Sequence, residues 1–101
     1  MDQIEPNSPV QLTVLSENAT KSLGRITQCS KESVELVAAT PAPPGAAVKI
    51  EGDDVLFLGE VSSCRTEGDS FVVSVEVKHA IYNTRELARL ASRLLDEAER
   101  L

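Results

Sequence analysis

Apolar and polar residues alternate with a period of two through most of this chain, from about residue 9 to residue 79. A period of two is typical of β-strands with one buried face, because successive side chains point to opposite sides of a sheet. The clearest run covers residues 70–78, where one face carries Phe71, Val73, Val75 and Val77. The pattern therefore predicts a mainly β fold of short antiparallel strands.

Turn residues divide the alternating region into six predicted strands. Three prolines fall within four residues of the segment 40–45, which excludes a central strand and predicts a rigid connector. Gly59 interrupts another run and marks a predicted bulge or close backbone approach. Because closure removes exposed strand edges, six such strands favour a closed or nearly closed barrel. The predicted strands cover residues 10–14, 22–29, 33–39, 46–51, 55–65 and 70–78.

Helical spacing replaces the alternation after residue 82. Asn83 is followed three residues later by Glu86, a pattern typical of a helix N-terminus with Asn83 as the N-cap. Apolar residues then recur at spacings of four and three, in a stripe made of Leu87, Ala91, Leu94, Ala98 and Leu101. We therefore predict a flexible lead over residues 1–8, a six-stranded antiparallel barrel over 9–82 and an amphipathic helix over 83–101.

The apolar stripe of this helix allows two interpretations. The favoured one is that the stripe packs across the mouth or the side of the barrel. The other is that the helix also pairs with a protein partner or with a second copy of the chain. Arg85, Arg89 and Arg93 form a row of like charge at a spacing of four, which is mildly unfavourable in an isolated helix and suits an acidic partner.

The charge balance limits the partners that this chain can meet. Sixteen acidic side chains outnumber ten basic ones, giving a net charge of −6. Residues 83–101 carry four of each sign, so the whole acidic excess falls on residues 1–82. Nucleic acids and anionic lipids are bound by basic surfaces, and we therefore expect neither as a partner. The first twenty residues lack the pattern of a targeting segment, and we expect a cytoplasmic protein.

No group of residues in the sequence is typical of a catalytic or metal site. His79 is the only histidine, and no nucleophile or carboxylate partner is indicated for it. Cys29 and Cys64 lie 35 residues apart without a CxxC pair. This spacing favours core thiols over a redox pair or a zinc site. Asp53 and Asp54 are typical turn acids. We expect neither an enzyme nor a metal or cofactor, and a small hydrolase or redox enzyme is the least favoured alternative.

Three stretches of the barrel region match the order of features in a known family. Residues 26–36 place Gln28, Ser30 and Ser33 between two strands, at the positions of an Asp/Asn-x-Ser-x-x-Gly motif. Residues 40–50 run from a proline-rich connector through a glycine into a strand, and residues 58–77 match a final hairpin. With this order and spacing the chain resembles a PilZ domain. That family comprises small six-stranded barrels, often followed by a C-terminal helix, and many members bind cyclic di-GMP.

The nucleotide-binding residues of that family are only partly present. The resemblance implies an Arg-x-x-x-Arg stretch before the first strand, where guanidinium groups hold phosphates and stack on guanines. This chain has no arginine before Arg25, and its lead carries Asp2 and Glu5 instead. In the second motif Ser30 is retained, whereas the Asp/Asn position holds Gln28. The glycine position holds Ser33, which adopts a positive φ less readily than glycine.

The resemblance implies a regulatory or adaptor domain in bacterial cyclic di-GMP signalling. The missing arginines predict that direct nucleotide binding is weak or lost, so that the domain acts through protein contacts of its helix and barrel surface. The alternative is a functional cyclic di-GMP receptor with a non-standard site, composed of Lys21, Arg25, Gln28, Ser30 and Ser33.

Overall fold

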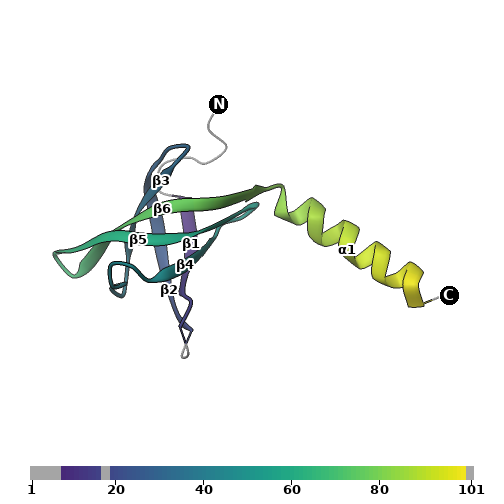
Figure 1. Ribbon diagram of the computed structural model, residues 1–101, viewed down its shortest axis with the longest axis horizontal. Helices are drawn as coiled ribbons and strands as arrows, with labels where there is room; N and C mark the ends of the chain where they lie inside the picture. The colour runs from purple at the N-terminus through teal and green to yellow at the C-terminus, as the bar shows by residue number, and fades with distance from the viewer. Residues whose placement is uncertain (1–7, 17–18, 100–101) are drawn as a thin grey trace.

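The computed structural model describes residues 8–16 and 19–99, which form six strands followed by one helix (Figure 1). β1 begins at Ser8, inside the predicted lead, and residues 1–7 lie outside the described part. The predicted helix position Leu101 also lies outside it, as does the side chain of Ala98. The elements are β1 (Ser8–Val14), β2 (Thr20–Cys29), β3 (Ser33–Ala38), β4 (Ala47–Glu51), β5 (Val55–Glu67), β6 (Ser70–Tyr82) and α1 (Thr84–Glu99).

The six strands form a closed antiparallel barrel in the order β1-β2-β3-β6-β5-β4. The sheet closes where β4 pairs with β1, for example at Leu12 and Ile50. The fold class predicted from the alternation, a six-stranded antiparallel barrel with a C-terminal helix, is confirmed. β3 and β4 are not neighbours in the sheet, so the proline-rich connector between them has to cross the barrel. Ala42 of this connector is fully buried in the core.

The inward faces of the strands pack into one hydrophobic core. Phe57 is the largest fully buried side chain, and its ring meets that of Tyr82 edge to face at a centroid distance of 6.2 Å. Burial of each such side chain contributes about 1.5–3 kcal/mol to folding. The core follows the predicted alternation and comprises Val10, Leu12, Ile26, Val34, Leu36, Ala38, Ala42, Val48, Ile50, Val55, Phe57, Val61, Val73 and Val75.

Gly59 is both a bulge and a point of close backbone approach, as its position in the sequence predicts. The register of β5 against β6 shifts between Leu58 and Gly59. A Cβ atom at Gly59 would lie 2.1 Å from the carbonyl oxygen of Glu76, a separation that no side chain tolerates. The backbones of the paired strands β5 and β6 therefore lie so close together here that residue 59 has to be glycine.

β5 and β6 both run further than the predicted strands, to Glu67 and Tyr82. The helix starts directly after β6 and extends away from the barrel instead of folding back on it (Figure 1). Among the described residues, the extensive contacts between elements are all between strands. Within residues 8–16 and 19–99, no helix has the length and apolar character needed to cross a membrane.

Candidate functional site

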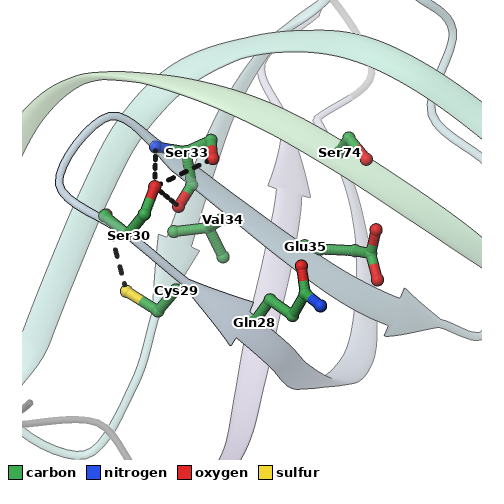
Figure 2. A pocket seen from close by; sticks show the side chains of 7 residues that line it. All are labelled: Gln28, Cys29, Ser30, Ser33, Val34, Glu35 and Ser74. Carbon is green, nitrogen blue, oxygen red and sulfur yellow. Dashed lines mark hydrogen bonds between the residues drawn. The ribbon is translucent and has the colours of Figure 1, made fainter.

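The turn between β2 and β3 is held by two serines that the sequence motif singled out. Ser33 donates its backbone N–H to the hydroxyl of Ser30 at 3.2 Å, and the two hydroxyl oxygens lie 3.0 Å apart. The backbone N–H of Ser30 donates to the carbonyl of Ser33 at 2.8 Å. Figure 2 shows both side chains at the tip of the turn. Their hydroxyls satisfy the backbone of a tight connection, the ordinary structural role of serine in turns.

A shallow hollow opens beside this turn, between β2, β3 and β6. Gln28 lies directly opposite Glu35 on the paired strands, and both side chains extend along the same side (Figure 2). Glu35 Oε1 also accepts a hydrogen bond from the hydroxyl of Thr27 at 3.2 Å. The hollow measures about 400 Å³, toward the lower end of small-molecule sites. Its lining consists of Gln28, Cys29, Ser30, Ser33, Val34, Glu35 and Ser74.

The electrostatic character of the hollow is acidic. Its lining contains one carboxylate, Glu35, and no lysine or arginine. Glu76 lies directly opposite Ser33 across β3 and β6. Lys78 donates a hydrogen bond to the Glu76 carboxylate at 2.7 Å. This hydrogen bond, together with the negative charge of Glu76, raises the pKa of Lys78 above the usual 10.5. Phosphate groups are bound by cations with free donors, and the lining offers none.

The structure brings together three of the five residues considered for a nucleotide site. Gln28, Ser30 and Ser33 line the same hollow, whereas Arg25 lines a separate apolar groove with Leu23. Lys21 pairs with Thr13 nearer the β1–β2 hairpin, seven residues from Gln28 along β2. At about 3.3 Å per residue this corresponds to about 23 Å. Lys21 therefore does not join the cluster, and Glu35 and Ser74 are lining residues that sequence reasoning missed.

The cysteines and the histidine lie on three different strands, β2, β5 and β6. Cys29 and Cys64 are both thiols, partly buried against the core. His79 is exposed on β6, opposite Leu58. In the described part of the chain, no group of three or more His, Cys, Asp and Glu side chains is arranged to hold a metal ion.

The prediction that the apolar stripe of α1 packs on the barrel is wrong. Because the helix extends clear of the strands, Leu87, Leu90 and Leu94 remain 50%, 43% and 64% exposed (Figure 1). Leu95 beside them is also exposed. A soluble monomer rarely presents such a continuous row of large apolar side chains without a partner. The helix is therefore the second candidate site.

The side chain that caps the N-terminus of α1 does not come from the predicted residue, Asn83. Asn83 occupies the N-cap position, since its carbonyl accepts the N–H of Leu87 at 3.1 Å, but its φ is +60°. The capping acceptor is Asp54 in the β4–β5 turn, whose Oδ1 accepts the N–H of Arg85 at 2.8 Å. The expected capping box is therefore not formed, and Glu86 instead pairs with Arg89 at 3.3 Å.

The first turn of α1 is attached to the barrel by further contacts of the same β4–β5 turn. The carbonyl of Asp54 accepts the N–H groups of Asn83 at 2.9 Å and of Thr84 at 3.4 Å. The guanidinium of Arg85 lies 3.6 Å from Asp53 and 3.8 Å from Asp54. An acid near a helix N-terminus also interacts favourably with the helix dipole. The two turn acids thus fix where the helix leaves the barrel.

Comparison with known proteins adds no family to this description. No protein-family model matches the chain, and a search of curated proteins finds no relative. Function is therefore inferred from the geometry of the hollow and of α1, together with the sequence resemblance.

Proposed function

We propose that this chain is a PilZ-like regulatory or adaptor domain that acts through protein contacts of α1, with direct cyclic di-GMP binding weak or lost. The observation that carries the proposal is the exposed apolar face of the helix, made of Leu87, Leu90 and Leu94. A barrel that holds a helix away from its own surface keeps that face available to another protein. Regulatory action in bacterial cyclic di-GMP signalling is inferred from the sequence resemblance.

The hollow beside the β2–β3 turn supports the second half of the proposal. Cyclic di-GMP carries two phosphates, and its recognition calls for guanidinium or ammonium groups in fixed positions. The lining supplies the Glu35 carboxylate and several neutral groups instead. Arg25 lies away from this cluster of neutral groups, in another groove. A dianionic ligand in this hollow would therefore be repelled by Glu35, and the lining offers no cation to offset that repulsion.

Calorimetric titration of the whole chain with cyclic di-GMP tests this proposal. We expect no saturable heat at high micromolar nucleotide, with guanosine monophosphate as the control for weak base stacking. Binding with a micromolar or tighter dissociation constant would contradict the proposal. The thermal unfolding midpoint should likewise stay unchanged by the nucleotide, because a ligand that binds only the folded state raises it.

The alternative function, a cyclic di-GMP receptor with a non-standard site, rests on one observation. Gln28, Ser30 and Ser33 do line a common hollow, and their amide and hydroxyl groups match the hydrogen-bonding edge of a base. If the titration shows binding, Ser30→Ala and Arg25→Ala separate two versions of this site. Loss of affinity in both variants indicates one extended site, whereas loss in Ser30→Ala alone indicates a site confined to the hollow.

A further inference from the structure

The exposed apolar face of α1 includes Leu87, Leu90, Ala91 and Leu94. We name these four residues the leucine stripe. All lie on one side of a helix that leaves the barrel at its first turn and makes no extensive contact with the strands (Figure 1). Arg85, Arg89 and Arg93 follow each other at a spacing of four on the opposite, charged side. The stripe is therefore narrow enough to be covered by one other helix, and the charged residues lie on the opposite face.

We propose that the occupant of the leucine stripe is a second copy of this chain, with its α1 antiparallel to the first. The inference rests on the proposed function, because it names the partner of the same helix. It is carried by two independent features of the helix: the sizes of the side chains along the stripe and the distribution of charge along the helix axis.

Side-chain size makes the stripe complementary to itself in one direction only. Heptad spacing puts Leu87 and Leu94 at one core position and Ala91 at the other, and Ala98 falls one heptad after Ala91. A parallel pair would set Ala91 against Ala91 and leave a void. An antiparallel pair sets Ala91 of each copy against Leu94 of the other, and Leu87 against Ala98. Alternation of large and small residues across facing layers gives close packing.

The distribution of charge along the helix also favours antiparallel pairing. Residues 84–93 carry three arginines and Glu86, a net of +2, whereas residues 94–101 carry three acids and Arg100, a net of −2. This order opposes the helix dipole, which prefers acids at the N-terminus and bases at the C-terminus, so it weakens an isolated helix. In an antiparallel pair each positive half lies over the negative half of its neighbour. In a parallel pair like charges would be aligned.

The arginines face away from the stripe, so charge selects the direction of pairing more than its strength. Helix axes in such a pair are about 8–10 Å apart. Charges on their outer sides lie further apart than the screening length of about 8 Å at physiological salt, so charge adds only a small bias toward the antiparallel direction. The affinity comes from the leucines. One helix per copy makes an interface smaller than about 1,200 Å², typical of reversible complexes. A twofold pair of this kind is also the commonest symmetry of homo-oligomers.

Sedimentation velocity of the whole chain over a concentration series tests the pairing. We expect a reversible monomer–dimer equilibrium in the micromolar range that depends only weakly on salt. Leu94→Glu places a charge in the stripe and should raise the dissociation constant by about tenfold or more. Ser92→Glu adds the same charge outside the stripe and should change it by less than about threefold. Circular dichroism at 222 nm confirms that each variant keeps its helix.

Disulfide trapping tests the direction. In a Cys29→Ser/Cys64→Ser background, Ala88→Cys and Leu95→Cys chains are mixed and oxidised, and the products are identified by mass. Antiparallel pairing brings position 88 of one copy beside position 95 of the other. The mixed 88–95 disulfide should therefore dominate over the symmetric 88–88 and 95–95 disulfides. Dominance of the symmetric products would show parallel pairing and overturn the proposal.

The outcomes separate this inference from the proposed function. If the chain stays monomeric at high micromolar concentration, or forms a trimer or larger assembly, the proposal that a second copy covers the stripe is overturned. The proposed loss of nucleotide binding is not affected by that result. Conversely, micromolar binding of cyclic di-GMP contradicts the proposed function whether or not the chain dimerises.

Discussion

Asp54→Ala is expected to unfold much of α1 while leaving the barrel intact. The Asp54 carboxylate accepts the backbone N–H of Arg85 at 2.8 Å, and this contact is lost in the variant. The backbone carbonyl at position 54, which accepts the N–H of Asn83 at 2.9 Å, is retained. The substitution therefore removes the cap of the helix without removing the hydrogen bonds that join it to the β4–β5 turn.

The size of the effect follows from the isolation of the helix. Loss of an N-cap carboxylate costs about 1 kcal/mol, which corresponds to about a fivefold change in an equilibrium constant. α1 has 16 residues, and isolated helices of this length are only marginally stable in water. With no packing against the strands to compensate, a helix populated about half of the time falls to about one sixth. The barrel, whose core lies elsewhere, should keep its stability.

Circular dichroism at 222 nm measures this change, because α1 is the one helix in the described part of the chain. The protein is kept dilute so that pairing between copies does not hold the helix folded. Two variants serve as controls. Asp54→Asn keeps an acceptor for the Arg85 N–H and should retain most of the signal. Asp53→Ala removes a side chain that is 89% exposed and meets Arg85 only at 3.6 Å, so it should retain nearly all of it.

Two results would refute the reasoning. An unchanged signal at 222 nm in Asp54→Ala would show that the carboxylate does not stabilise the helix. A matching loss of barrel stability, seen as collapse of the amide shifts of strand residues in NMR spectra, would show that Asp54 acts within the β4–β5 turn instead.

Three further predictions concern the barrel. Gly59→Ala would place a Cβ 2.1 Å from the Glu76 carbonyl oxygen, so unfolding in urea should reveal a loss of about 3 kcal/mol. Gly68→Ala, with open space around it but a φ of +62°, should cost only about 1 kcal/mol, and the reverse order would contradict the close-approach account. Thr13 is buried, and its hydroxyl has no hydrogen-bond partner among the described residues, so Thr13→Val should be neutral or stabilising by about 1 kcal/mol in thermal unfolding. A fall in the midpoint of several degrees would show that the hydroxyl is satisfied. Ser30→Ala should lower stability by about 1 kcal/mol, since the hydrogen bonds that it removes are exposed contacts with Ser33 within the turn, and a much larger loss would show that the turn organises more of the barrel.

The strands were predictable because their determinant is local. Alternation in β3 and β6 places Val34, Leu36, Val73 and Val75 on the inner face, and the structure buries all four. The ends of β5 and β6 were not predictable in the same way. Beyond about residue 78, β6 continues by pairing with residues 55–58 of β5, but its own side chains there are mostly exposed, so no alternation in β6 marks the continuation.

The surroundings of the helix depend on contacts that sequence spacing does not reveal. Its existence and its first residue follow from the change of period, but the cap comes from Asp54, 31 residues before Arg85. Two adjacent acids in a turn are ordinary turn chemistry, and only the pairing of β5 with β6 brings them to the helix. The exposure of the stripe was unpredictable for a related reason. Helical spacing shows that a face is apolar but not which surface covers it.

The position of the acidic excess supports the proposal that recognition falls to the helix. Glu60 lies directly opposite Glu76 across β5 and β6, an arrangement that costs energy unless a cation offsets it. Lys78 does so, because it donates to Glu76 at 2.7 Å. This lysine is therefore already paired with Glu76, and it is not among the residues that line the hollow beside Glu35. The barrel near the turn thus suits a neutral or cationic group. Four large apolar side chains are exposed together on α1, namely Leu87, Leu90, Leu94 and Leu95, whereas those exposed before the helix are Leu15, Leu23 and Tyr82.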